Sequence, residues 1–224
     1  AYHNLNVKFV GVGAGLAYGT MGITHHATED IAVFRALPNM TIISPCDPIE
    51  TEQATIAAYN QSGPVYLRLG LTGEPNIHSP DYKFELGNFD VLRNGEDIAL
   101  ISTGRMVTPV MSAATILKEK NISVAVINVH TINPPPDNLI FYLTCTNTVD
   151  AILTIEEHNI IGGLGSAIIE KIIGHEIFLF QRMGIPDKFC TEYGSWPYLQ
   201  EKLGLSAQHI VDEAMTLLGR ANNV

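Results

Sequence analysis

Two adjacent histidines, His25 and His26, stand where a glycine-rich stretch gives way to an expected helix. In open α/β folds, loops at the carboxyl ends of parallel strands hold the ligand. An imidazole at such a place could hydrogen-bond a substrate hydroxyl or transfer a proton near neutral pH. A surface or capping role is an equally good interpretation of His25. A metal site made by both histidines is a weaker hypothesis, because adjacent side chains seldom point the same way.

A second titratable cluster, Glu156, Glu157 and His158, follows an expected strand over 151–155 and precedes a glycine turn. Two carboxyl groups beside an imidazole could act as an acid–base pair. The same three residues could also form a turn or an interface, and we favour that interpretation. The residues alone therefore leave a catalytic role for this cluster open.

Two glycine-rich stretches follow expected strands, as phosphate-binding loops do, but neither has the required spacing. A dinucleotide loop starting at Gly11 needs glycine where Leu16 stands, and one starting at Gly13 needs glycine where Tyr18 stands. Residues 162–166 precede an expected helix, whose free N–H groups could bind an anion, but no lysine follows as in a P-loop. We therefore expect both stretches to permit close packing of the backbone.

The composition excludes several classes of protein. Of the 224 residues, 16% are charged and 46% are apolar, and the net charge is -10. Soluble domains average about 25% charged residues. This sparse charge argues against disorder, and the shortage of Lys and Arg argues against nucleic acid as a partner. No apolar run reaches the roughly 18 residues of a membrane-spanning helix, so we expect no membrane insertion.

The cysteines and the first residues bear on the cellular setting. Cys46, Cys145 and Cys190 lie far apart, so they form neither a disulfide framework nor a zinc pattern. A reducing cytoplasm is the simplest location for such a chain. The first eight residues have no signal-peptide pattern. They also lack an initiator Met, so we expect a processed chain or a piece of a longer one.

The elements that must position these residues alternate between short apolar runs and helical patterns. This alternation predicts βαβ units, mostly parallel sheets and an α/β fold. Asp47 before Pro48, with Glu50 three residues after the cap, is a strong helix start. The expected strands cover 8–12, 41–44, 65–69, 98–102, 124–128, 151–155 and 178–181. The expected helices cover 29–37, 47–60, 107–120, 133–145, 162–173, 196–203 and 206–218.

The chain divides into two blocks. Residues 72–87 break the alternation with several glycines and prolines, which is typical of a linker. We therefore predict a first domain over 1–74, a linker over 75–89 and a second domain over 90–224. The second block has enough strands and helices for a complete small α/β domain. The first has only three strands and two helices, so we expect it to be the C-terminal part of an incomplete domain.

The motifs, taken in order, resemble the transketolase family. The first group is similar to its pyrimidine-binding domain and the second to its C-terminal domain. The similarity covers nearly the whole chain and is greatest to the C-terminal subunit of split, two-chain transketolases. The first group comprises residues 19–32, 34–40, 45–47 and 63–69, and the second comprises 101–104, 126–132, 154–158 and 162–165.

This resemblance implies an enzyme that transfers a two-carbon ketol unit between sugar phosphates. Thiamine diphosphate with Mg²⁺ supplies the chemistry in that family, and another domain or subunit holds the diphosphate and the metal. The glutamate and aromatic residues that grip the pyrimidine would lie upstream of Ala1. The resemblance therefore implies a diphosphate-binding partner and a homo-oligomer such as a dimer. It also implies that the chain alone is inactive and does not bind the cofactor tightly.

The resemblance assigns roles to two residues and exposes three departures. His25 matches a histidine that contacts the substrate hydroxyls near the reactive carbon, so it is the candidate catalytic and substrate-binding residue. His26 is a weaker substrate-binding candidate, because the family often has glutamine there. Met21 replaces a frequent Asp, Gly13 a frequent His, and Leu71 a frequent phosphate-binding Arg. The loss of these polar groups predicts an atypical substrate.

Several alternatives stay open at this point. Within thiamine enzymes they are a deoxyxylulose-phosphate synthase and the β subunit of a 2-oxoacid dehydrogenase. Outside that class the chain could be a non-catalytic module that holds a dimer together. A nicotinamide oxidoreductase is third, and the failed glycine spacing already counts against it.

Overall fold

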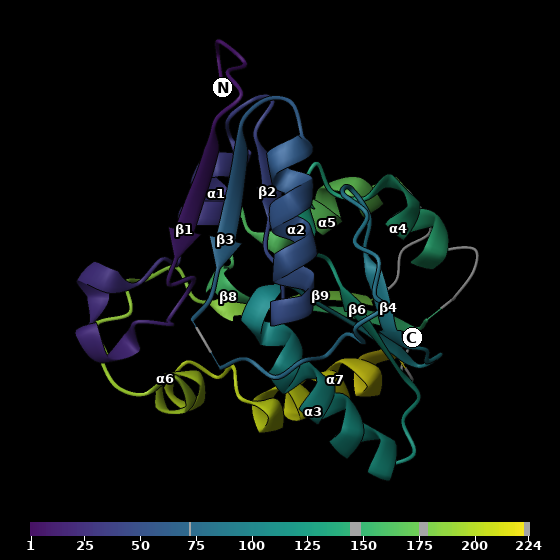
Figure 1. Cartoon of the computed structure of the whole chain (residues 1–224). Coiled ribbons are helices and arrows are strands. Elements are labelled where there is room, and N and C mark those ends of the chain that lie inside the picture. The colour runs from purple at the N-terminus through teal and green to yellow at the C-terminus, as the bar shows by residue number, and fades with distance from the viewer. Residues whose placement is uncertain (72, 144–148, 175–178, 222–224) are drawn as a thin grey trace.

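The computed structural model describes residues 1–71, 73–143, 149–174 and 179–221 (Figure 1). None of the helices in these ranges is long and apolar enough to cross a membrane. The strands are β1 (Lys8–Val12), β2 (Thr41–Ile43), β3 (Val65–Leu69), β4 (Asp90–Arg93), β5 (Ile98–Ser102), β6 (Val124–Asn128), β7 (Thr131–Asn133), β8 (Ala151–Asn159) and β9 (Leu179–Ile185). The helices are α1 (Asp30–Arg35), α2 (Pro48–Asn60), α3 (Val107–Glu119), α4 (Asp137–Phe141), α5 (Leu164–Ile172), α6 (Trp196–Lys202) and α7 (Ala207–Ala221).

The strands form two open sheets, which confirms the predicted α/β class. The first sheet has the order β1-β3-β2-β7, and the second has the order β4-β6-β5-β8-β9. All neighbours are parallel except two edge pairs, β2 with β7 and β4 with β6. Strand β7 comes from the second half of the chain, so the first sheet gains its fourth strand from beyond residue 90.

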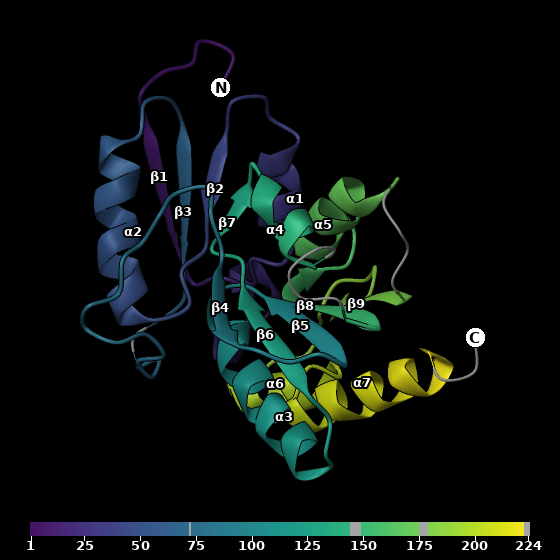
Figure 2. The same ribbon diagram turned by 90° about the vertical axis from the view of Figure 1, so that its right-hand side faces the viewer.

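Helices cover both sheets, and α5 lies between them (Figure 2). Helix α2 packs on one face of the first sheet, and α1 packs on the other. The second sheet has α3, α6 and α7 on one face and α4 and α5 on the other. Ala167 of α5 belongs to the core of the first sheet, whereas Leu164, Ile168 and Ile172 belong to that of the second. Helix α5 therefore joins the two cores.

Most predicted elements are present with boundaries within a few residues. Asp47 caps α2 as predicted, because its Oδ1 accepts a hydrogen bond from the Glu50 N–H at 2.7 Å. Two predictions fail for physical reasons. Strands β4 and β7 are short edge strands without an alternating pattern, and the sequence reasoning missed both. The strand expected over 151–155 continues to Asn159. The end of the helix expected over 133–145, and position 178, lie outside the described residues.

The segment after β3, expected to be a linker, has neither helix nor strand over 73–89 and packs along α2. The N–H groups of Ile77 and His78 both donate to Asp47 Oδ2 at 2.7 Å. The Gln53 side chain accepts from the N–H of Phe84 at 2.8 Å. The segment is thus held to α2 and its N-cap by hydrogen bonds from backbone N–H groups to the side chains of Asp47 and Gln53.

Candidate active site

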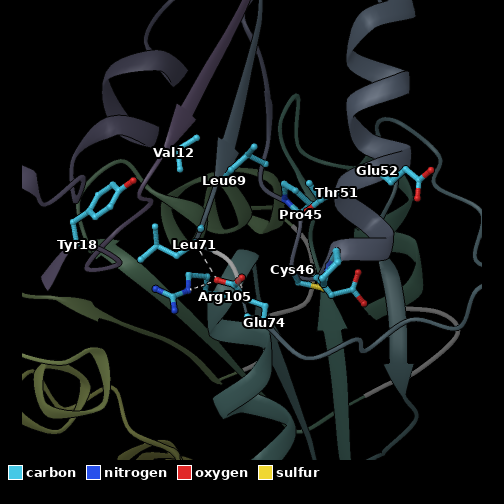
Figure 3. A pocket seen from close by; sticks show the side chains of 14 residues that line it. Val12, Tyr18, Pro45, Cys46, Thr51, Glu52, Leu69, Leu71, Glu74 and Arg105 are labelled. Carbon is cyan, nitrogen blue, oxygen red and sulfur yellow. Dashed lines mark hydrogen bonds and ion pairs between the residues drawn. The ribbon is translucent and has the colours of Figure 1, made fainter.

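A cavity of about 640 Å³ opens at the carboxyl ends of β1, β2 and β3 (Figure 3). This is the edge at which parallel α/β sheets place their ligands. The loop after β1, the start of α2, the loop after β3 and the turn after β5 form its walls. The lining residues are Val12, Tyr18, Pro45, Cys46, Asp47, Pro48, Thr51, Glu52, Leu69, Gly70, Leu71, Gly73, Glu74 and Arg105.

The glycine-rich loop after β1 packs tightly, as predicted, instead of cradling a phosphate. Gly15 has φ +59°, and a Cβ there would come within 2.2 Å of the Glu157 Oε2. The N–H of Leu16 donates to the same oxygen at 3.1 Å. Gly13 has φ +99°, and its Cβ would meet the Tyr18 ring at 2.3 Å. Glycine is therefore required here by backbone conformation and by close approach.

His25 lies at the end of the short 3-10 helix Ile23–His25 and is exposed to solvent. Its Nδ1 lies 3.0 Å from the hydroxyl of Thr24. Its ring packs edge-on against Tyr18, with the ring centroids 6.4 Å apart. Tyr18 lines the cavity but His25 does not, so the exposed His25 lies at the margin of the cavity, next to Tyr18.

His26 points elsewhere. Both of its ring nitrogens are buried and have no hydrogen-bond partner among the described residues. It lines a separate cavity of about 140 Å³ together with Glu29, Phe189 and Cys190. The structure therefore does not bring the two histidines together. His26 contributes nothing to the larger cavity in this chain.

The cluster of Glu156, Glu157 and His158 corrects a sequence expectation. We expected it after a strand, but it lies within β8, and all three side chains are buried. Glu156 accepts the N–H groups of Leu164 and Gly165 at 2.6 and 3.0 Å. Burial raises the pKa of Glu156 to about 7, although these two donors oppose the shift. An internal carboxyl group therefore occupies the anion-binding N-terminus of α5.

The other two members of the cluster connect the sheets. Glu157 accepts the Trp196 indole N–H as well as the Leu16 N–H, and burial raises its pKa. His158 donates from Nδ1 to the Asn159 carbonyl at 2.6 Å, and its Nε2 lies 3.3 Å from the amide nitrogen of Ala32 in α1. These contacts favour the interface interpretation of the cluster.

A buried ion pair lies beside this cluster, on the side of β3 away from the cavity. Arg68 Nε is 2.8 Å from Asp30 Oδ2, and their side chains are only 4% and 13% exposed. Arg68 also donates to the carbonyls of Ala27 and Glu157 at 3.0 and 3.3 Å. Burial alone would raise the pKa of Asp30, but Arg68 and the Tyr66 hydroxyl outweigh it and lower that pKa. The pair fixes β3 to α1 and β8.

Sequence reasoning missed two charged residues in the cavity, Glu74 and Arg105. Arg105 Nε lies 2.7 Å from Glu74 Oε1, and the guanidinium stacks over the Trp196 ring at 4.2 Å. The available signal was position: Arg105 follows the carboxyl end of β5 by three residues, a place where α/β folds put ligand-binding groups.

Two further clusters have the residue types of cation ligands, and the first of them includes Cys46 and Asp47 of the cavity wall. One contains Cys46, Asp47 and His78, and the other contains Glu50, Asp90 and His130. Their carboxylates already accept hydrogen bonds from this chain; Asp47 Oδ2, for example, accepts from the N–H of His78 at 2.7 Å. They therefore tie α2, the 73–89 segment and β4 together. Neither cluster includes His25 or His26.

Two known protein families match this chain, one for each of its two regions. The family described as "Transketolase, pyrimidine binding domain" matches residues 1–71, and "Transketolase, C-terminal domain" matches residues 87–210. The chain belongs to the transketolase family. The predicted resemblance is thereby confirmed, and the cavity lies in the part that matches the pyrimidine-binding domain, except for Gly73, Glu74 and Arg105.

Several of the transketolase relatives are named as subunits. The chain is 39% identical over 217 residues to an apulose-4-phosphate transketolase subunit of Actinobacillus succinogenes, covering 96% of this chain and 69% of that protein. It is 36% identical over 222 residues to "6-deoxy-6-sulfo-D-fructose transketolase subunit SqwH" of a Clostridium species, covering 99% and 68%. The solved structure "Split gene transketolase, inactive beta4 tetramer" superposes with a TM-score of 0.85 at 34% identity, covering 98% and 68%.

Membership of the transketolase family implies dependence of the complete enzyme on thiamine diphosphate. The similarity to split-transketolase subunits implies a partner subunit and an oligomer. The described residues do not fit the diphosphate or its metal. The N-termini of α2 and α5 are already capped by Asp47 and Glu156. Arg105 is the one Lys or Arg among the described residues lining the cavity, and it is paired with Glu74. Among the described residues, the cavity therefore has a single basic side chain and neither α2 nor α5 offers a free N-terminus for a diphosphate.

Proposed function

We propose that this chain is part of the second subunit of a split transketolase, which transfers a two-carbon ketol unit between sugar phosphates. The observation that carries the proposal is the cavity at the carboxyl edge of the pyrimidine-binding sheet, with the accessible His25 beside it. In the complete enzyme the partner subunit would bind the diphosphate and Mg²⁺, because the described residues of this chain place only one basic side chain in the cavity. Similarity to split-subunit relatives over nearly the whole chain supports this division of labour.

His25 would hydrogen-bond the substrate hydroxyls and exchange a proton with the alkoxide that develops there. Its exposure and its edge contact with Tyr18 support this role. His26 stays the weaker substrate-binding candidate, because its ring lines the smaller cavity and not the larger one. The proposal retains the domain division at residues 74 and 90, a dimeric assembly and a cytoplasmic location.

The test is reconstitution with a diphosphate-binding subunit, thiamine diphosphate and Mg²⁺. Ketol transfer from a ketose phosphate to an aldose should appear only in the complete mixture. His25→Ala should then lower kcat/KM by about 100-fold or more, as expected for loss of a proton-transferring group. His209→Ala, on α7 far from the cavity in the sequence and the fold, serves as the matched control.

Two outcomes would overturn the proposal. Turnover of pyruvate or branched 2-oxoacids without turnover of ketose phosphates would favour one of the other thiamine enzymes. Calorimetry on the isolated chain gives an independent check, because micromolar binding of thiamine diphosphate by this chain alone would contradict the division between subunits.

A further inference from the structure

We propose that Arg105 binds the anionic tail of the substrate, a phosphate or sulfonate group carried by the sugar. This inference rests on the proposed function and adds a specificity-determining residue to it. Arg105 lies on the short 3-10 helix Gly104–Met106, directly after β5, and reaches into the cavity between Tyr18 and Glu74 (Figure 3). The second region of the chain thereby supplies a residue to the cavity of the first.

The charge in the cavity singles out Arg105. It is the one Lys or Arg among the described lining residues, and it lies in the same cavity as the apolar Leu71. The carboxylate of Asp47 already accepts three backbone N–H groups, those of Glu50, Ile77 and His78. Glu52 stands across the cavity from Arg105 (Figure 3). An anionic tail would therefore be drawn to the Arg105 end of the cavity.

The guanidinium is held in place but not satisfied. Its side chain is 14% exposed, and its plane lies against the Trp196 ring, whose indole is in turn fixed by Glu157. Arg105 Nε and Nη1 are both buried, and neither makes a hydrogen bond with the described residues. Buried donors without acceptors are costly. A planar, pre-positioned fork with free donors is suited to two oxygens of a phosphate or sulfonate.

Without substrate, the Glu74 carboxylate lies against Arg105, where the phosphate or sulfonate of the sugar would bind. Its Oε1 lies 2.7 Å from Arg105 Nε and also accepts the Leu71 N–H at 3.1 Å. The contact with Arg105 is an ion pair without a well-directed hydrogen bond, so a tetrahedral oxyanion would satisfy the guanidinium better. Gly70 makes room for both partners, since a Cβ there would lie 2.6 Å from Arg105 and 2.7 Å from Glu74.

Steady-state kinetics of the reconstituted enzyme separate the anionic tail from the rest of the sugar. Three sugars are compared: a sugar phosphate, the corresponding sulfonate and the neutral sugar. Arg105→Gln should raise KM for the two anionic sugars by about 10- to 100-fold, with little change in kcat, and should leave the neutral sugar unaffected. Arg105→Lys should give an intermediate KM because it keeps the charge but loses the fork. Glu74→Gln should lower KM for the anionic sugars several-fold.

The comparison of the three sugars also identifies which anionic group Arg105 binds. A KM effect confined to the phosphate, or to the sulfonate, names the natural substrate class. Arg35→Gln is the matched control, because Arg35 is similarly buried and ion-paired at 2.7 Å to Glu170, away from the cavity. An equal rise in KM for all three sugars, or no rise for the anionic ones, would overturn the assignment.

A second measurement does not depend on turnover and so stands if the proposed function fails. Trp196 is the only tryptophan of the chain and lies against Arg105. Titration of the chain with inorganic phosphate or sulfate should therefore give a saturable change in Trp196 fluorescence. The change should vanish in Arg105→Gln and persist in Arg35→Gln. Saturable binding that survives Arg105→Gln, or no response in the unmodified chain, would refute anion binding by Arg105.

Discussion

The two sheets of this chain are covered to very different degrees. Strands β5 and β6, in the middle of the second sheet, are buried along their whole length, with a core on each face. Strand β1, at the edge of the first sheet, leaves Phe9, Val10 and Val12 between 47% and 58% exposed. Apolar side chains on an unpaired edge are a liability unless another surface covers them. The second region is thus the well-covered scaffold of the chain, whereas the first leaves apolar side chains of its edge strand exposed.

The difference follows from how each region obtains its core. The second sheet lies between helices that come from its own half of the chain, and Leu16 is the residue of the first region that joins its core. The first sheet takes β7 as its fourth strand and Ala167 of α5 as part of its core, both from the second half. The cavity forms at this dependent region, with Arg105 contributed by the scaffold.

The largest expected effect on stability concerns Arg68, which pairs with Asp30 and also donates to the Glu157 carbonyl of β8. Arg68→Met should lower the free energy of unfolding by about 3–5 kcal/mol, because it leaves the buried Asp30 carboxylate without its partner. Urea unfolding followed by circular dichroism measures the change. Lys171→Met removes one partner of an exposed ion pair with Asp137 and should change stability far less. Equal losses in both variants would show that the buried Arg68–Asp30 pair contributes no more to stability than an exposed one.

A smaller loss of stability is expected from truncating a core side chain, and it should differ between the central strand β5 and the edge strand β1. Leu100→Ala in β5 should cost about 2–5 kcal/mol, because the side chain is completely buried and leaves a cavity. Val10→Ala in β1 should stay within about 0.5 kcal/mol in the isolated chain, because that side chain is already half exposed. Thermal unfolding of the two variants tests this. A comparable loss at Val10 would mean that β1 is covered in solution.

The smallest expected effect concerns pH. Burial raises the pKa of Glu156 from 4.5 to about 7, so between these values the folded chain binds more protons than the unfolded one. Its stability contribution therefore falls as pH rises through this window, and levels off above pH 7. The advantage of the unmodified chain over Glu156→Gln should shrink by about 1–3 kcal/mol between pH 4.5 and 7.5.

Denaturant titrations at several pH values measure this difference. Comparing two chains at each pH cancels the histidines whose pKa burial lowers, such as His130 at about 4, which act in the opposite direction. The exposed Glu119→Gln controls for the loss of a carboxyl group. A difference that stays constant, or grows with pH, would contradict the buried titration of Glu156.

Sequence reasoning succeeded where local chemistry decides the structure. The apolar runs at 98–102 and 124–128 are buried parallel strands, as predicted, because side chains covered on both faces need no alternation. Asp47 and Pro48 start α2 as predicted, because capping involves only neighbouring residues. The family was also recognisable from the ordered motifs, and the comparisons confirmed it.

Sequence reasoning failed where distant segments decide it. The strand β7 exists because β2 offers it an edge, and no property of Thr131–Asn133 announces this. Sequence reasoning favoured an interface role for Glu156 and Glu157 but did not give their partners, which follow from β8 continuing beneath the loop at Leu16 and the start of α5.

The sequence by itself determined the α/β class, the family and His25 as the candidate reactive group. These depend on periodicity, turn chemistry and motif order, all of which are local. Only the tertiary structure separated His26 from His25, removed the Glu156 cluster from the candidate catalytic groups and brought Arg105 to Glu74. The placement of these side chains depends on which strand ends and helix N-termini lie close together in the fold. Burial and charge pairing arise only from that packing.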